Sequence, residues 1–101
     1  MDRKNRIEAA EAALNSARVG VDTFARALDA FDASQAQVAE VSDYLGSEDW
    51  FDDREAYDRD ESLQEVPAGI LSEDLGYDLL VDNRDIAIRM LEIATKVLKE
   101  L

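Results

Sequence analysis

The sequence predicts an all-α fold: an antiparallel bundle of three to four helices with one long acidic connection. Apolar residues recur at steps of three and four positions in the N-terminal third and again near the C-terminus. This spacing places them on one face of an α-helix. One proline and four glycines leave few positions that would interrupt long helices. A chain of 101 residues fits one domain, which we expect to span residues 1–101.

The first helix is predicted over residues 3–31. Ala, Leu, Arg and Glu, which are strong helix formers, fill most positions between its apolar residues. Gly20 is the weakest helix former of this stretch, and it lowers helix stability by about 1 kcal/mol relative to Ala. A helix cannot bury its apolar stripe alone. We expect cover from within the chain, with a homodimer through this stripe as the alternative. The stripe comprises Ile7, Ala10, Leu14, Ala17, Val21, Phe24, Leu28 and Phe31.

A second helix is predicted over residues 35–45. Ser34, followed three positions later by Gln37, forms a capping-box pattern that favours a helix start. No glycine or proline enforces a break before it, so one uninterrupted helix to Leu45 is the alternative. Gly46 suits the left-handed position that often ends a helix.

Residues 46–71 are predicted to form an acidic, aromatic connection. Ser47 can cap a short helical turn, and the acidic residues after it favour the positive end of the helix dipole. Residues 43–65 carry ten acidic side chains and two arginines, a net charge of −8 out of −13 for the chain. Pro67 and Gly69 indicate a turn near the end of the connection.

Two further helices are predicted over residues 72–82 and 84–101. Ser72 is the expected cap, and Asp82-Asn83 is the expected kink or break. The apolar face of this region is broad, which suits a helix packed against two others. It comprises Leu75, Leu79, Leu80, Ile86, Ala87, Met90, Leu91, Ile93, Ala94, Val97, Leu98 and Leu101.

Composition excludes several classes of site. The sequence contains no cysteine and no histidine, which removes disulfides, thiolate metal sites and the commonest general base. The net charge of −13 argues against binding nucleic acid or an anionic membrane surface. No apolar run is long enough to span a membrane. We therefore expect a cytoplasmic protein with no cofactor and no catalytic residue.

The aromatic residues of the acidic region have two interpretations. Aromatic side chains rimmed by charge often anchor partners. The favoured interpretation of the aromatic set Tyr44, Trp50, Phe51, Tyr57 and Tyr77 is that it closes a small core under the connection. The candidate partner-binding residues are Tyr44, Asp49, Trp50, Asp52, Asp53 and Tyr57.

Clustered carboxylates raise the question of a metal site. Oxygen ligands suit Ca²⁺ and Mg²⁺, but the EF-hand spacing is missing, so a solvated acidic face is favoured and no metal is predicted. The acids concerned are Asp43, Glu48, Asp49, Asp52 and Asp53. Two further acid pairs are similar to those of all-α nucleotide pyrophosphohydrolases, although the gap between the pairs is far longer here. They are Glu8 with Glu11 and Asp82 with Asp85.

Two motifs resemble an uncharacterised family of small bacterial proteins, the domain of unknown function 4298. They are Ser42-Asp43-Tyr44-Leu45-Gly46-Ser47-Glu48-Asp49-Trp50 and Gly69-Ile70-Leu71-Ser72-Glu73-Asp74-Leu75-Gly76-Tyr77-Asp78-Leu79-Leu80. The resemblance covers essentially the whole chain and implies a bacterial, cytoplasmic, helical protein. It implies no activity. The chain departs from the family pattern at Leu45, where a second Tyr is frequent, and after Pro67, where no basic residue follows.

The functional hypothesis is a non-enzymatic interaction or accessory module whose acidic segment faces a basic protein surface. The uneven charge and the missing catalytic residue types favour it. One alternative is an Mg²⁺- or Mn²⁺-dependent nucleotide or phosphate hydrolase that uses the clustered carboxylates. A structural homodimer is the other alternative.

Overall fold

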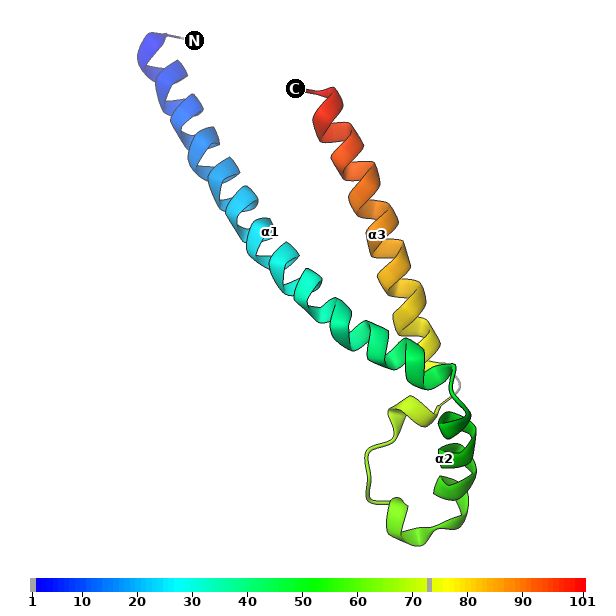
Figure 1. Ribbon diagram of the computed structural model, residues 1–101. Coiled ribbons are helices and arrows are strands. Elements are labelled where there is room, and N and C mark those ends of the chain that lie inside the picture. Colours follow the sequence, from blue (N-terminus) through cyan, green and yellow to red (C-terminus); the bar gives the residue numbers. More distant parts are fainter. Residues whose placement is uncertain (1, 73) are drawn as a thin grey trace. The chain divides into compact units, whose positions relative to one another are not determined.

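The computed structural model describes residues 2–72 and 74–101, and it is helical (Figure 1). The α-helices are α1 (Arg3–Leu45), α2 (Glu48–Arg59) and α3 (Leu75–Lys99), and two 3₁₀ turns, η1 (Glu61–Leu63) and η2 (Gly69–Leu71), lie between α2 and α3. No strand occurs in the described residues, so the all-α class is confirmed. The chain falls into two units, residues 1–35 and 36–101, and each is considered by itself.

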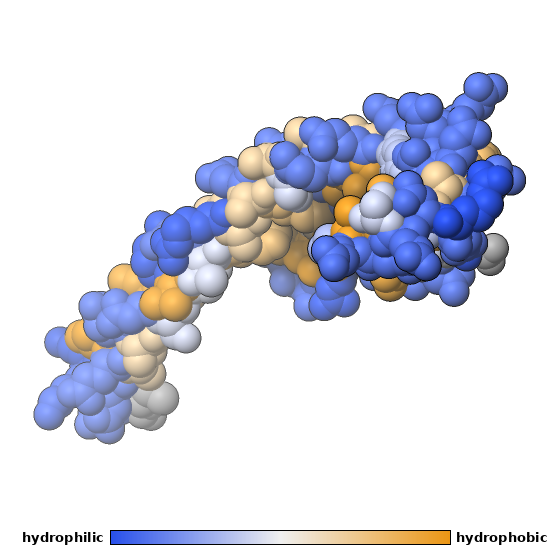
Figure 2. Space-filling model, turned by 90° about the horizontal axis from the view of Figure 1, so that it is seen from below, coloured by the Kyte–Doolittle hydropathy of each residue, from blue (hydrophilic) through white to orange (hydrophobic). Residues whose placement is uncertain are grey.

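The unit of residues 1–35 consists of the greater part of α1. The Asn5 backbone N–H donates to Asp2 Oδ1 at 2.7 Å, which satisfies one free donor at the helix start. Its apolar stripe finds no second segment inside this unit, and Phe24 keeps an exposed fraction of 56%. Figure 2 shows apolar surface emerging between hydrophilic side chains along this helix. The predicted helix is confirmed, but this unit holds no core of its own among the described residues.

The predicted break between residues 31 and 35 is wrong, and the alternative of one uninterrupted helix to Leu45 is what the structure shows. Ser34 Oγ donates to the Phe31 carbonyl at 2.7 Å, and Gln35 Nε2 donates to the same oxygen at 3.3 Å. A serine that bonds back to the preceding turn is compatible with a helix interior. The capping-box pattern therefore did not mark a helix start.

The turn between α1 and α2 is tight. Ser47 Oγ donates to the Tyr44 carbonyl at 2.6 Å and accepts the Trp50 backbone N–H at 3.4 Å, so its predicted role as the cap of α2 is confirmed. The Gly46 N–H donates to the Ser42 carbonyl at 3.2 Å, continuing the helical pattern. The left-handed conformation predicted for Gly46 is wrong, because no described glycine has a positive φ.

The core of the 36–101 unit is small and lies where α1, α2, η2 and α3 meet. Leu45, Trp50 and Leu71 are its buried residues. Partly buried apolar side chains surround them: Val41, Tyr44, Tyr57, Ala68, Ile70 and Leu80. Gly76, in the first turn of α3, allows a close approach, since a Cβ there would lie 2.6 Å from Leu45 Cδ1. A side chain at this position would separate α3 from the end of α1.

The predicted connection 46–71 contains more helix than expected, because α2 extends to Arg59. Asp60 ends it and begins η1: its Oδ1 accepts from the Ser62 backbone N–H at 2.9 Å and from Ser62 Oγ at 2.6 Å. These bonds stabilise the carboxylate and lower the pKa of Asp60. Gln64 Nε2 donates to the Tyr57 carbonyl, which ties the turn after η1 back to α2. Side-chain hydrogen bonds thus stabilise the connection at the start of η1 and just after it.

α3 begins at Leu75 and not at residue 72, and it continues to Lys99 without the predicted break at Asp82-Asn83. Ser72 Oγ accepts the Leu75 N–H at 3.2 Å, so this serine still satisfies a donor at the helix start. Glu73, part of the predicted start, lies outside the described residues. Within the residues that the structure describes, no helix has the length and apolar character needed to cross a membrane.

Candidate functional site

The six candidate residues lie on the end of α1 and on α2, and all belong to the 36–101 unit. The carboxylates Asp49, Asp52 and Asp53 are exposed, whereas Tyr44 and Tyr57 are half-buried. Ser47 sets this pattern by fixing the first residue of α2, because the helical repeat then turns the acidic positions outward and Trp50 inward.

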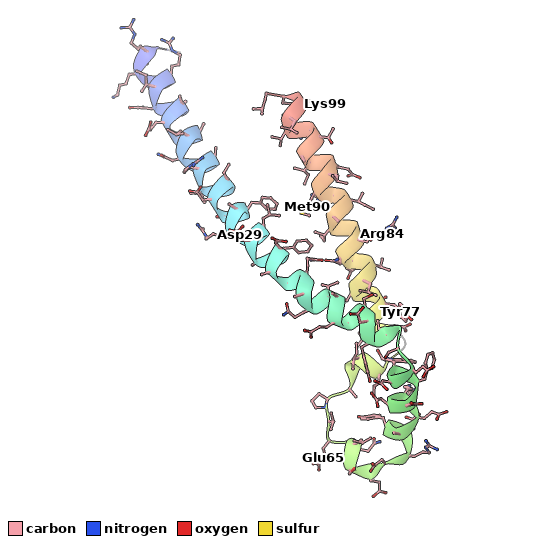
Figure 3. The ribbon with its side chains drawn as sticks, in the orientation of Figure 1. Asp29, Glu65, Tyr77, Arg84, Met90 and Lys99 are labelled. Atoms are coloured by element: carbon pink, nitrogen blue, oxygen red, sulfur yellow. The ribbon has the colours of Figure 1, made fainter. Side chains whose placement is uncertain are left out.

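Trp50 belongs to the core. Only 9% of its surface is exposed, and its Nε1 donates to the Ile70 carbonyl at 2.9 Å. Its ring meets that of Phe51 edge-on, with centroids 5.1 Å apart, although Phe51 itself is 64% exposed. Trp50 therefore supports the candidate surface from below, as the core-closing interpretation expected for the aromatic set. Phe51 is exposed, and so is Tyr77, which is labelled in Figure 3, so the core-closing interpretation is wrong for these two residues.

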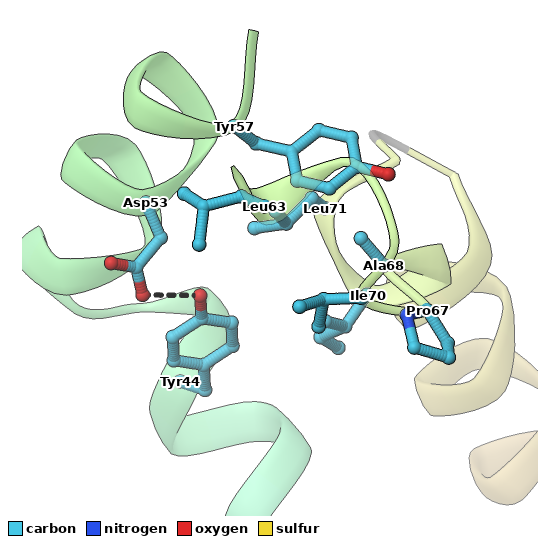
Figure 4. Close-up of a pocket in the computed structure, with 9 residues that line it drawn as sticks. Tyr44, Asp53, Tyr57, Leu63, Pro67, Ala68, Ile70 and Leu71 are labelled. Carbon is cyan, nitrogen blue, oxygen red and sulfur yellow. Dashed lines mark hydrogen bonds between the residues drawn. The ribbon is translucent and has the colours of Figure 1, made fainter. Parts of the chain in front are cut away.

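Tyr44 and Asp53 are joined across the α1–α2 turn. The Tyr44 hydroxyl donates to Asp53 Oδ2 at 2.6 Å (Figure 4). Partial burial, this hydrogen bond and the negative charges of Asp53 and Asp49 together raise the pKa of Tyr44 to about 12. The phenol thus stays protonated as a donor, and it occupies one of the two oxygens of Asp53.

A shallow cavity of about 220 Å³ opens beside this pair (Figure 4). We call it the Tyr44–Asp53 groove. Its walls come from the end of α1, from α2 and from the segment that contains η1 and η2. The lining residues are Tyr44, Asp53, Tyr57, Leu63, Val66, Pro67, Ala68, Ile70 and Leu71.

Three of the groove residues were candidates from the sequence, and six were missed. The missed residues are Leu63 and the run from Val66 to Leu71 without Gly69. Pro67 and Gly69 are typical turn residues, so the sequence predicts only a turn in that run. The signal that could have identified it was the unbroken apolar character of residues 66–71 inside an acidic region.

The arginines of α2 pair with carboxylates of the same helix. Arg54 Nη1 lies 2.9 Å from Asp58 Oδ1, and Arg59 Nη2 lies 3.8 Å from Glu55 Oε2. Both are exposed i,i+4 pairs, each of which stabilises a helix by about 0.3–0.5 kcal/mol. No ion pair in the described part of the chain involves Asp49, Asp52 or Asp53. The negative face of α2 is therefore not neutralised by the described cations of the chain.

The other carboxylate candidates do not form a cluster that the structure describes. Glu8 lies in the 1–35 unit, 3.8 Å from Lys4 Nζ, while Asp82 and Asp85 lie in the other unit. Among residues 2–72 and 74–101, no group of three or more acidic side chains has the geometry to hold a metal ion.

Comparison with known proteins places the chain in a family. No curated protein and no solved structure matches it. The family model described as "Domain of unknown function (DUF4298)" matches residues 7–93, which span both units and include the whole candidate site. The resemblance seen in the two sequence motifs is thereby confirmed: the chain belongs to the DUF4298 family.

Proposed function

We propose that this protein is a non-enzymatic interaction module whose acidic region, residues 43–65, binds a basic surface on a partner protein. The observation that carries the proposal is the exposed, unneutralised carboxylate face of α2, formed by Asp49, Asp52 and Asp53. Negative potential concentrated on one face raises the rate of encounter with basic partners and disfavours acidic ones.

The core beneath this face supports the proposal. Trp50 and Leu71 hold α2 against η2, so the carboxylates project from a packed element. A rigid scaffold reduces the entropy lost on binding, compared with a disordered acidic tail. The two arginines of α2 do not compete for these carboxylates, because each already pairs with an acid one turn away.

The test is affinity capture from a lysate with the wild type and two charge-matched variants. One variant neutralises the α2 face (Asp49→Asn, Asp52→Asn, Asp53→Asn). The control neutralises three exposed carboxylates of the 1–35 unit (Glu11→Gln, Asp29→Asn, Asp32→Asn), none of which has an ion pair in the described residues. We expect a salt-sensitive partner that the control retains and the α2 variant loses. Equal loss in both variants, or in neither, would contradict the proposal.

We also propose that the apolar stripes of α1 and α3 cover each other in an antiparallel helical bundle. Support comes from the many large apolar side chains on both helices that remain about half exposed, including Phe24, Ile86 and Ile93. Exposed apolar surface of this extent indicates an interface. In a bundle of one chain, sedimentation equilibrium gives the monomer mass and the melting temperature does not depend on protein concentration.

The same stripes favour a homodimer as the competing structural role. A second copy would cover the residue 7–31 stripe just as a helix of the same chain would. Sedimentation would then give twice the monomer mass, and dilution would lower the melting temperature. Either result decides between the two arrangements without affecting the proposal for α2.

A further inference from the structure

The Tyr44–Asp53 groove combines two chemical characters. Its walls are mainly apolar, from Leu63, Ile70 and Leu71 among others, whereas its polar groups come from two tyrosines and one carboxylate. Sites that recognise a ligand generally pair an apolar lining with a few placed polar groups. At about 220 Å³ the groove is smaller than the roughly 300–1,000 Å³ of drug-sized ligand sites, which suits a single inserted side chain.

Asp53 supplies an acceptor that the described chain leaves unused. Its Oδ2 accepts the Tyr44 hydroxyl at 2.6 Å, and no described residue donates to its Oδ1. The nearest cation in sequence, Arg54, pairs with Asp58 instead. Tyr44 thus fixes the orientation of the Asp53 carboxylate, and the second carboxylate oxygen has no hydrogen-bond donor among the described residues.

The charge of the surroundings selects the occupant. Residues 43–65 carry a net charge of −8, which repels an acidic segment and attracts a basic one. A purely apolar side chain would cover Asp53 without pairing with it, and a desolvated, unpaired carboxylate is costly. A cationic side chain with a long aliphatic stem matches both the walls and the acceptor.

We propose that the Tyr44–Asp53 groove receives an arginine side chain from a basic segment of the partner protein. The stem lies along the apolar walls, and the guanidinium donates to the Asp53 carboxylate beside the rings of Tyr44 and Tyr57. Arginine suits this place better than lysine, because its planar, weakly hydrated head stacks on aromatic rings and donates several parallel hydrogen bonds. This inference rests on the proposed function, since it names how the basic partner is held.

The probe is N-acetyl-arginine methylamide, titrated into the full chain while backbone amide shifts are followed by NMR. We expect saturable shifts at the groove residues Tyr57, Ala68 and Ile70, and weaker binding of the corresponding lysine and leucine amides. Asp53→Asn is expected to weaken binding of the arginine amide about fivefold, the upper range for an exposed ion pair. Asp29→Asn, the same change at an exposed aspartate outside both the groove and the acidic region, is the matched control and is expected to leave binding unchanged.

A second variant tests the groove without changing its charge. Ala68→Leu places a larger apolar side chain in the groove and is expected to abolish the shifts, with unaltered far-UV circular dichroism showing that the chain stays helical. Tighter binding of the leucine amide, equal loss in Asp29→Asn and Asp53→Asn, or shifts spread along α2 would each overturn the inference.

The outcomes separate this inference from the proposed function. If a partner is lost on neutralising the α2 face but binds Ala68→Leu normally, the interaction module stands and the arginine groove is wrong. If the arginine amide binds the groove as described but no captured partner depends on α2, the groove inference stands and the proposed partner surface is wrong.

Discussion

The two units of the chain hold their apolar residues in different ways. The 36–101 unit buries Leu45, Trp50 and Leu71 against one another, whereas the 1–35 unit is a helical segment with Ile7 and Phe24 more than half exposed. Helical periodicity in the sequence is enough to predict the helix of the 1–35 unit, but a core requires side chains brought together from several elements. The candidate site lies in the 36–101 unit because, among the described residues, only this unit has a packed core that positions the side chains of the site.

The largest expected effect is the loss of that core. Trp50→Ala removes a buried ring and its hydrogen bond to Ile70, and we expect it to reduce the free energy of unfolding by about 3–5 kcal/mol. Phe51→Ala, the adjacent exposed aromatic, is the matched control and is expected to cost about 1 kcal/mol, mainly the ring contact with Trp50. Urea denaturation measures both. Equal losses would show that Trp50 is not a core residue.

One glycine in each unit tests how closely its surroundings are packed. A Cβ at Gly76 would lie 2.6 Å from Leu45 Cδ1, so Gly76→Ala is expected to destabilise the chain by about 1–3 kcal/mol. A Cβ at Gly20 meets nothing within 4 Å, so Gly20→Ala is expected to stabilise its helix by about 0.4–1 kcal/mol. Thermal denaturation by far-UV circular dichroism should give shifts of opposite sign. A destabilised Gly20→Ala variant would instead indicate that this face of α1 is closely covered.

The smallest effect concerns the hydrogen bond between Tyr44 and Asp53. Tyr44→Phe is expected to cost about 1 kcal/mol at neutral pH, the usual net value of one hydrogen bond. The pKa of Tyr44 is about 12 in the folded chain, against 10.0 for an ordinary tyrosine. The unfolded state therefore releases this proton first, and the stabilisation is complete below pH 10 and falls as the pH rises toward 12.

Unfolding of both forms at increasing alkaline pH measures this difference. The wild type should lose its advantage over Tyr44→Phe as the pH rises through this window. A difference in the free energy of unfolding that stays constant with pH would show that Tyr44 does not donate this hydrogen bond.

Sequence periodicity predicted the helices well, because apolar spacing and helix-forming residues act locally. It located the breaks poorly. Ser34 can cap a helix or bond back to Phe31 within one, and the sequence pattern does not distinguish the two. Asp82-Asn83 likewise lies inside α3, where the neighbouring helix formers outweigh the weak local preference for a break.

The candidate site was predicted only in part for a related reason. Its acidic residues follow from composition, and the Ser47 cap from a local pattern. The contact of Trp50 with Ile70 and the groove joining Tyr44 to Pro67 bring together residues distant in sequence. No helical or turn pattern encodes such pairs, so Leu63 and the run from Val66 to Leu71 were not recognised as walls of a site.

Trp50 is the only tryptophan of the chain, so its fluorescence tests directly whether a packed core underlies the candidate site. In the full chain without denaturant, we predict emission at shorter wavelength than in concentrated urea and weak quenching by acrylamide, because the indole is 9% exposed and bonded to Ile70. Emission and quenching equal to those of the denatured chain would show that Trp50 is not packed in a core.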